Sequence, residues 1–63
     1  MSVKRNQFIT HLQNNKCYLH RNGAKHDIFQ NSITKKKTTV PRHPQLDKNL
    51  CNAICKQLEI PKL

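Results

Sequence analysis

Residues 17–30, with the sequence CYLHRNGAKHDIFQ, decide the fold. Residues 17–21 and 25–30 each have the length of a short strand, and the turn-forming sequence Asn22-Gly23-Ala24 lies between them. An Asn-Gly dipeptide is a strong short-range signal for a β-hairpin, because both residues tolerate the backbone angles of a tight turn. The stretch therefore predicts two antiparallel strands joined by a tight turn.

A third strand is expected directly downstream of this hairpin. Residues 31–36 are polar and basic, which is typical of a turn, and residues 37–40 are rich in β-branched side chains. Pro41 follows and ends the strand, because proline cannot donate a hydrogen bond to a neighbouring strand. The three strands are expected to form an antiparallel meander.

An amphipathic helix is expected on each side of the meander. The first runs from Lys4 to about Asn14 with Ser2 as its N-cap, and the second follows the N-cap Asp47 and ends near Glu59. Apolar residues spaced three and four apart predict the buried stripes of the two helices: Phe8, Ile9 and Leu12 in the first, and Leu50, Ile54 and Leu58, with Ala53 beside them, in the second.

The order helix, three antiparallel strands, helix predicts a two-layer α+β domain. Two helices cover one face of a three-stranded sheet and leave the other face open to a partner. Residues 42–46 are expected to be a plain connection between the third strand and the second helix. The same order and size occur in double-stranded-RNA-binding domains, which recognise A-form RNA by its shape and backbone. We therefore expect a double-stranded-RNA-binding-domain-like fold.

The chain is short and strongly basic. It has 63 residues, and 12 Lys and Arg against 3 Asp and Glu give a formal net charge of +9. This length excludes a two-domain protein, a nucleotide-binding α/β fold and a barrel enzyme. No apolar run approaches the ~20 residues of a membrane span, and no apolar stretch follows the basic first residues as it would in a secretory signal. We expect a cytoplasmic protein with no membrane partner and with an anionic one, nucleic acid being favoured over an acidic protein.

The three cysteines, Cys17, Cys51 and Cys55, are expected to be reduced. An odd number of cysteines without a secretory signal is typical of a reducing compartment. Cys51 and Cys55 lie four residues apart on one helical face, and His43 would be a further zinc ligand. A Cys-x3-Cys spacing without a second cysteine pair is a weak zinc signal, however. We therefore expect half-buried helix residues here, with no metal site and no cofactor.

His26 is the leading candidate for chemistry. It lies three residues after Gly23, between Lys25 and Asp27, where a strand that starts directly after a turn holds its side chain near the surface. A histidine with an ordinary pKa of about 6.5 can take the proton of a ribose 2′-hydroxyl at neutral pH. The 2′-oxygen then cleaves the adjacent phosphodiester without a metal. The alternative is a surface histidine that contributes only charge or a hydrogen bond.

The other histidines have weaker claims. His20 lies close to the same turn and is a candidate general acid. His43 is expected to support the connection between strand and helix or to contact a phosphate. His11 belongs to the polar side of the first helix, where no role is expected.

The excess positive charge is expected to bind RNA phosphates. With only two Phe and one Tyr in the chain, stacking of bases is not expected to dominate, so binding should be electrostatic and sensitive to salt. Lysines 25, 35, 36 and 37 are candidates to stabilise charge on the phosphorane. A solvated lysine run that only aids solubility is the alternative. The candidate RNA-binding residues are Lys4, Arg5, Arg21, Lys25, Lys35, Lys36, Lys37 and Arg42.

Three segments of the chain together resemble the HicA family of toxins: residues 19–29 (LHRNGAKHDIF), 37–43 (KTTVPRH) and 49–58 (NLCNAICKQL). The family motif has a Gly, two variable residues and a His, followed later by a Thr-Val-Pro-Arg-His-like segment. Both parts are present here in order and at family spacing. The likeness extends from end to end, which implies a single HicA-like toxin domain over residues 1–63.

The resemblance implies a function as well as a fold. Members of the family are small basic mRNA interferases with a double-stranded-RNA-binding-like fold, and they are the toxins of type II toxin–antitoxin systems. On this basis the chain is expected to be an endoribonuclease with His26 as its catalytic general base. Gly23 is then expected to shape the turn, and Pro41, Arg42 and His43 to support the fold or the RNA path.

The resemblance also implies a partner. Family members are held inactive by a HicB antitoxin encoded beside them, and for this chain the antitoxin is expected to be acidic and to cover His26 and the basic face. The sequence departs from many members at Lys16, where they have Gly, and at Ala24, where they have Ser or Gly. The first change is expected to alter the turn from helix to strand, and the second to weaken a supporting hydrogen bond.

Two other functions remain open on the sequence alone. A non-catalytic double-stranded-RNA-binding module would bind RNA in a salt-dependent way without cleaving it. A small ribosome-associated structural protein would suit the charge, and would co-sediment with ribosomes at high salt.

Overall fold

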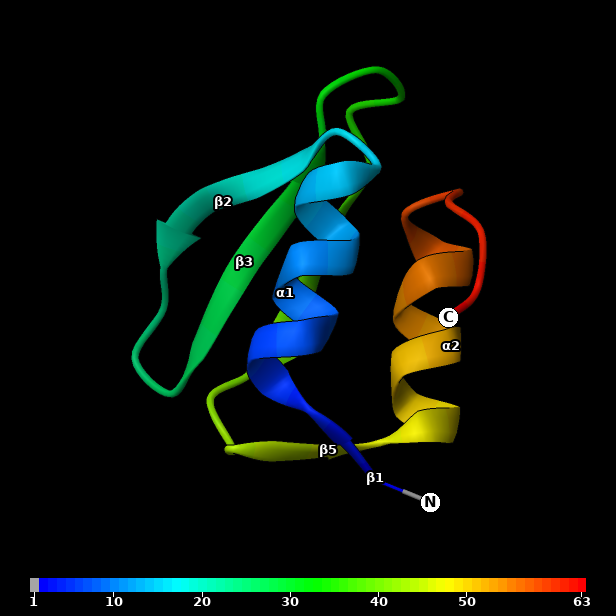
Figure 1. The fold of residues 1–63 in the computed structure, drawn as a ribbon. Helices are drawn as coiled ribbons and strands as arrows, with labels where there is room; N and C mark the ends of the chain where they lie inside the picture. Colours follow the sequence, from blue (N-terminus) through cyan, green and yellow to red (C-terminus); the bar gives the residue numbers. More distant parts are fainter. Residues whose placement is uncertain (1) are drawn as a thin grey trace.

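The computed structural model describes residues 2–63, and this part of the chain is a two-layer α+β structure (Figure 1). Its elements, in chain order, are β1 (Ser2–Lys4), α1 (Arg5–Asn14), β2 (Cys17–Asn22), β3 (His26–Asn31), β4 (Lys37–Pro41), β5 (Gln45–Asp47) and α2 (Lys48–Gln57). Both helices lie on one side of the sheet formed by β2, β3 and β4, where α1 packs on β2 and α2 on β4. The predicted fold class is confirmed, and the arrangement is consistent with a double-stranded-RNA-binding-domain-like fold.

The three-stranded sheet is the predicted meander, in the order β2–β3–β4 with antiparallel neighbours. Its register is interrupted once, because Leu19 pairs with Phe29 but Arg21 pairs with Ile28. His20 is therefore the extra residue of a β-bulge, a feature that bends a strand and redirects its side chains. As a result, Arg21 points to the same side of the sheet as its partner Ile28.

The molecule also has a second sheet, which consists of two strands. One of these strands begins within residues 42–46, so the prediction of a plain connection there is wrong. β1 and β5 pair antiparallel, with Val3 opposite Leu46. The predicted role of Ser2 is also wrong. The N-cap position of α1 is Lys4, which makes no side-chain capping bond, and the Ser2 hydroxyl instead donates to Gln45 Oε1 at 3.0 Å. Ser2 lies in β1, and its hydroxyl bonds to a residue of β5 and not to the first turn of α1.

The core lies between the helices and the three-stranded sheet. It consists of these buried side chains: Phe8, Leu12, Cys17, Phe29, Val40, Leu46, Cys51, Ile54, Cys55 and Leu58. Of the stripe predicted for α2, only Ile54 and Leu58 are buried, because Ala53 is exposed and Leu50 is 40% exposed. A strict spacing of four residues drifts by ~40° per step around a helix with 3.6 residues per turn, and Cys51 and Cys55 occupy the core-facing positions.

The cysteines are more deeply buried than the sequence predicts. Cys51 and Cys55 have no exposed surface and Cys17 is buried beside them in the core. All three are free thiols. Burial raises the pKa of each thiol, so the neutral form packs as a small apolar side chain. Among residues 2–63, no group of three or more His, Cys, Asp and Glu side chains is arranged to hold a metal ion.

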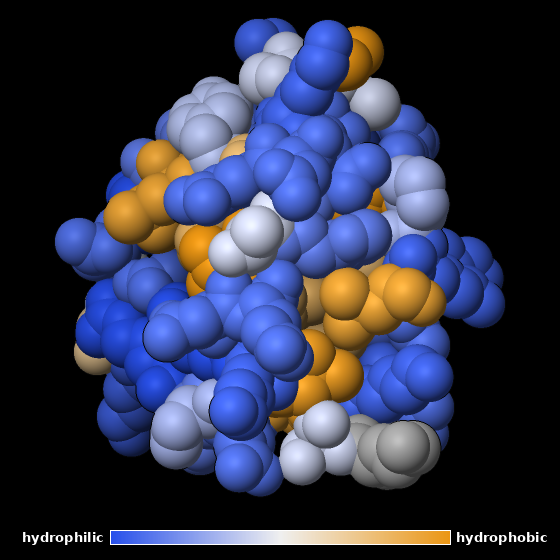
Figure 2. All heavy atoms as spheres, viewed as in Figure 1, coloured by the Kyte–Doolittle hydropathy of each residue, from blue (hydrophilic) through white to orange (hydrophobic). Residues whose placement is uncertain are grey.

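The surface is hydrophilic over most of the helix side, where apolar atoms are confined to small separate patches (Figure 2). Within residues 2–63, neither helix is long and apolar enough to cross a membrane.

Both helices end in a left-handed residue that is not glycine. Lys16 follows α1 with a φ of 66°, and Glu59 follows α2 with a φ of 59°. After α2, Glu59 N donates to Lys56 O and Ile60 N donates to Cys55 O, which is the Schellman pattern. The left-handed conformation costs an L-residue with a side chain roughly 1–2 kcal/mol, and glycine adopts it without that cost.

Replacement of Lys16 or Glu59 by glycine is therefore expected to stabilise the protein. The gain should be about 0.5–1 kcal/mol after the extra chain entropy of glycine is subtracted, or roughly 2–8 °C in Tm for a domain of this size. Thermal unfolding followed by circular dichroism measures it. Gln13→Gly, inside α1, is the matched control and should lower the Tm. A fall in Tm for Lys16→Gly would show that the lysine side chain contributes more than its backbone conformation costs.

Candidate active site

In the turn of the predicted hairpin, two backbone segments lie unusually close together. Asn22 pairs with Asp27, so residues 23–25 form the loop between β2 and β3. Gly23 N donates to His26 O at 2.7 Å. A Cβ atom on Gly23 would lie 2.6 Å from that same oxygen. The glycine does not have a positive φ, so it is required here for space and not for an unusual backbone angle.

His26 is the first residue of β3 and is exposed beside this loop. It pairs with Pro41 of β4. Its side chain borders an open hollow of about 340 Å³ that is also lined by Gly23, Ala24, Lys25, Ile28 and Thr39. The lining is mostly apolar, and the side chains in it that carry a polar group are those of Lys25, His26 and Thr39. A substrate in the hollow would therefore lie beside an imidazole, a lysine and a hydroxyl on an otherwise apolar surface.

Asp27 lies directly after His26 and faces the helix side of the sheet, because successive strand residues point to opposite faces. Its carboxylate accepts hydrogen bonds from Arg5 Nη2 at 2.7 Å and from Arg42 Nε at 2.9 Å. Both arginines form ion pairs with it. Arg5, Asp27 and Arg42 are called the Asp27 cluster below.

The Asp27 cluster holds the backbone on both sides of His26. Arg42 Nη2 also donates to Gly23 O at 2.7 Å, which ties the loop to the end of β4. Arg5 Nε donates to Pro41 O at 2.9 Å, which ties the strand partner of His26 to the start of α1. The two arginines thus have internal partners, while contact of either one with RNA stays a prediction.

Substitution of Asp27 by asparagine is expected to make the Tm depend less on pH in the acid range. Hydrogen bonds from Arg42, together with the positive charges of Arg42 and Arg5, lower the pKa of the Asp27 carboxyl. A carboxyl with a lowered pKa stabilises the fold above its unfolded pKa of ~3.9, and this stabilisation is lost as the pH falls through its folded pKa. Tm measured from pH 7 to pH 2 should show the wild type above Asp27→Asn at pH 7 and the two converging in acid. A constant difference at every pH would contradict this.

The structure brings only some of the predicted basic residues near His26. Lys25 lies in the loop itself, and Arg21 pairs with Ile28 on the neighbouring strand. Lys37 pairs with Gln30, four residues along β3 from His26, which corresponds to ~13 Å at ~3.3 Å per residue. Lys35 and Lys36 precede it in the connecting loop. The three lysines of residues 35–37 therefore do not lie at His26, where they would be needed to stabilise a phosphorane.

The remaining candidates are spread over the molecule. Lys4 is exposed in β1, and His43 is exposed between β4 and β5. His20 is the bulged residue of β2, and its role as a general acid stays a prediction. His11, for which no role is expected from the sequence, does make a contact. Its Nε2 lies 2.8 Å from Pro61 O, and this contact links α1 to the segment after α2.

The sequence reasoning missed the role of Asp27. Its partners are 22 and 15 residues away in the chain, so no local spacing indicates the ion pairs. The available signal is compositional. One of only three acidic side chains lies next to the candidate catalytic residue in a chain with 12 Lys and Arg, which indicates an internal partner for the arginines.

Residues 5–60 of the chain match a family model described as the HicA toxin of bacterial toxin–antitoxin systems. This range includes all the elements that carry His26, the hollow and the Asp27 cluster. Comparison with the curated proteins and with the solved structures gives no match.

Proposed function

Because the chain belongs to the HicA family of toxins from bacterial toxin–antitoxin systems, we propose that it is a metal-independent endoribonuclease that cleaves mRNA in the cytoplasm. Family membership makes it a toxin with a cognate antitoxin. The proposed reaction is supported by the position of His26, which is exposed at the start of a strand, beside a cation and an open hollow. Residues 1–63 would form one toxin domain.

In the proposed reaction, neutral His26 accepts the proton of a ribose 2′-hydroxyl. The 2′-oxygen attacks the adjacent phosphorus, and the bond from phosphorus to the 5′-oxygen of the next nucleotide breaks. The leaving 5′-oxygen takes a proton from a general acid, for which His20 is the candidate. Lys25, which lines the same hollow, is the proposed cation that stabilises the developing negative charge. The products carry a 2′,3′-cyclic phosphate and a 5′-hydroxyl.

The loop between β2 and β3 is suited to hold a general base in place. The backbone of His26 is fixed by Gly23 N, and the loop carbonyl of Gly23 is fixed by Arg42. A general base held within hydrogen-bond reach of its proton contributes more than a mobile one. Gly23, Pro41 and Arg42 act through the backbone in this proposal, with His43 beside them in sequence.

The substrate is proposed to be held by its phosphates. The candidate contacts are Lys4, Arg5, Arg21, Lys25, Lys35, Lys36, Lys37 and Arg42. The cognate antitoxin is proposed to be an acidic protein that covers His26 and neutralises part of the net charge of +9. It would compete with RNA for the same cations.

The proposed reaction is tested by identifying the chemical groups at the ends of the RNA fragments. Purified protein with EDTA and an RNA oligonucleotide is expected to yield fragments with 2′,3′-cyclic phosphate ends, identified by mass spectrometry. A single 2′-deoxy substitution at the cleaved nucleotide should abolish cleavage at that position, because the attacking oxygen is missing. A matched oligonucleotide with the 2′-deoxy group two nucleotides away should still be cut. Fragments with 3′-hydroxyl ends, or full inhibition by EDTA, would contradict the proposed mechanism.

A second candidate function is a non-catalytic RNA-binding module, supported by the double-stranded-RNA-binding-domain-like fold. It requires that the protein binds RNA in a salt-dependent way while the oligonucleotide stays intact. The same incubation, with binding measured in parallel, separates the two functions.

A further inference from the structure

One face of the three-stranded sheet has neither helix on it within residues 2–63. Cys17, Phe29 and Val40 are buried on the helix side of β2, β3 and β4, so the residues that alternate with them point the other way. This open sheet face consists of Tyr18, Arg21, His26, Ile28, Gln30, Lys37 and Thr39. It therefore contains the candidate general base.

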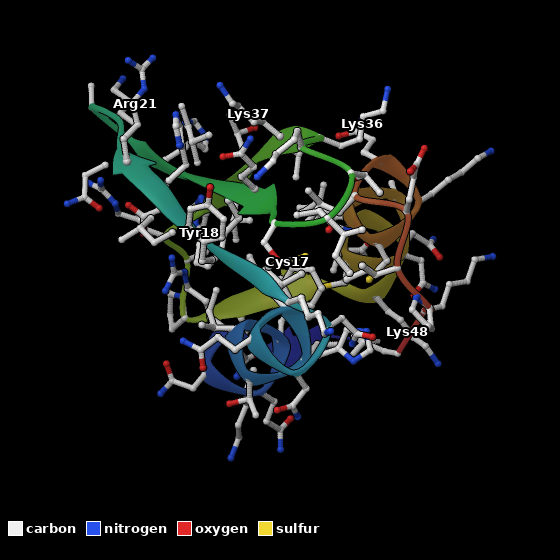
Figure 3. All side chains as sticks on the ribbon, turned by 90° about the horizontal axis from the view of Figure 1, so that it is seen from above. Cys17, Tyr18, Arg21, Lys36, Lys37 and Lys48 are labelled. Atoms are coloured by element: carbon white, nitrogen blue, oxygen red, sulfur yellow. The ribbon has the colours of Figure 1, made fainter. Side chains whose placement is uncertain are left out.

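The charge of the open sheet face is entirely positive in the described part of the chain. Asp27 points to the opposite side of the sheet, Asp47 is the N-cap of α2 with its carboxylate on Leu50 N, and Glu59 follows α2. Arg21 and Lys37 lie on the two outer strands of the face, and both side chains point away from α1 (Figure 3). A phosphate backbone crossing the face would meet cations on either side of the central strand.

The open sheet face is organised by hydrogen bonds before any ligand arrives. The Tyr18 hydroxyl donates to Gln30 Oε1, and Gln30 Nε2 donates to Lys35 O at 3.2 Å. These bonds hold the ring of Tyr18, which is 42% exposed, against the middle of the sheet. An exposed aromatic ring held in this way is a surface on which a nucleotide base can stack.

The basic loop at the far end of the face is also fixed. Asn31 Oδ1 accepts hydrogen bonds from Ile33 N at 2.8 Å and Thr34 N at 3.2 Å. The other end of the Asn31 amide donates to Leu58 O at 2.7 Å, which attaches the loop to the end of α2. Lys35 and Lys36 therefore project from an anchored loop, and Lys37 follows them as the first residue of β4.

We propose that the open sheet face is the surface on which the RNA lies, as a single strand that runs from Lys36 and Lys37 at one end to His26 at the other. This inference rests on the proposed ribonuclease function. The distance along β3 between the two ends is ~13 Å, so the strand contacts the protein over several nucleotides on one side of the cleaved bond.

The features of the face favour a single strand over a duplex. Contact with two successive minor grooves of a duplex extends over ~16 base pairs, whereas the part of this face between Lys37 and His26 extends only ~13 Å along β3. Single strands are bound by a positive groove with an aromatic ring on which unpaired bases stack. The apolar hollow beside His26 offers a place for one unpaired base, and in a duplex that base is not available. In a strand without a partner, the 2′-oxygen can also reach a position in line with the leaving oxygen.

The binding face is tested with two matched double variants. Arg21→Gln/Lys37→Gln removes two charges from the open sheet face, and Lys48→Gln/Lys56→Gln removes two exposed charges from α2 on the other side. For single-stranded RNA, the first is expected to raise KM at least tenfold at 150 mM salt with kcat unchanged. It should also reduce the slope of log binding constant against log salt by about 1.4, since each phosphate contact contributes ~0.7. The second should change KM less than twofold. An equal or larger effect of the α2 variant would overturn the proposal.

A second comparison tests the strand state of the RNA and the role of Tyr18. The same cleavable oligonucleotide is offered alone and annealed to a 2′-O-methyl complement, and the single strand should be cut at least tenfold faster. Tyr18→Leu should weaken binding about 5- to 150-fold, as expected for loss of one stacked base at ~1–3 kcal/mol, whereas Tyr18→Phe keeps the ring. Equal cleavage of the duplex would overturn the proposal.

The proposed binding face and the proposed cleavage reaction can be contradicted independently of each other. Binding is also measured by fluorescence anisotropy with a 2′-O-methyl oligonucleotide that cannot be cleaved. A loss of affinity on Arg21→Gln/Lys37→Gln, in a protein that cleaves no RNA, would support the binding face and contradict the proposed nuclease function. Cleavage of RNA with no effect of this double variant would do the reverse.

Discussion

Replacement of His26 by alanine is expected to lower the rate of RNA cleavage by about 10²- to 10⁴-fold, the usual contribution of a general base. The fold should not change. The His26 side chain is exposed, and the contact that shapes its loop is made by the backbone oxygen of His26 with Gly23 N. The loss should therefore appear in kcat, measured with an RNA oligonucleotide at saturating concentration, while the Tm stays at the wild-type value. Growth arrest on expression should be lost in parallel.

His11→Ala is the matched control for this substitution. It removes another imidazole, on α1, whose contact is with Pro61 O, far from the loop in sequence. It is expected to lower the Tm slightly and to leave kcat unchanged. A folded His26→Ala protein that cleaves RNA at the wild-type rate would show that another group removes the proton.

Truncation of Phe8 to alanine is expected to unfold much of the protein at 25 °C. Phe8 has no exposed surface and belongs to the core between the helices and the sheet. Substitutions of this kind cost ~3–5 kcal/mol, because apolar contacts are lost and a cavity is left. The whole stability of a domain with 63 residues is expected to be about 3–9 kcal/mol at roughly 0.05–0.15 kcal/mol per residue. Urea denaturation followed by circular dichroism measures the loss.

Ile33→Ala is the control for the effect of removing apolar volume. Ile33 is 68% exposed in the loop before β4, so its truncation should change the free energy of unfolding by no more than about 0.5 kcal/mol. If Phe8→Ala unfolded at the same urea concentration as Ile33→Ala, the core would not be where the structure has it.

The elements that could be predicted from the sequence are those with a repeating pattern long enough to detect. The helix around Phe8 and Leu12, and the strands on either side of Gly23, have such patterns and were placed to within one or two residues. β1 and β5 have three residues each, and three residues contain no measurable alternation. Their pairing depends on the close approach of distant segments, which only the assembled fold provides.

The residues of the candidate site also fall into two groups, those that could be predicted from the sequence and those that could not. His26 was identifiable because its chemistry and its distance from Gly23 are local properties of the chain. The Asp27 cluster was not, because its three members come from the start of α1, from β3 and from the segment after β4. Likewise, the separation of Lys37 from His26 follows from the register of β3 and β4, and sequence proximity to the hairpin does not reveal it.

The pairing of β1 with β5 has a consequence for how the toxin is made. The strand at residues 2–4 is synthesised before its partner at residues 45–47. α2, which supplies Cys51, Ile54 and Cys55 to the core, and its C-cap residue Leu58 are synthesised after both strands. A ribosome that adds ~5–20 residues per second needs several seconds for this chain. We expect the nascent toxin to lack a closed core, and hence a fixed His26, until α2 has been synthesised and has packed. Under the proposed function, the ribosome and the message that produce the toxin would not be exposed to an active nuclease before that point.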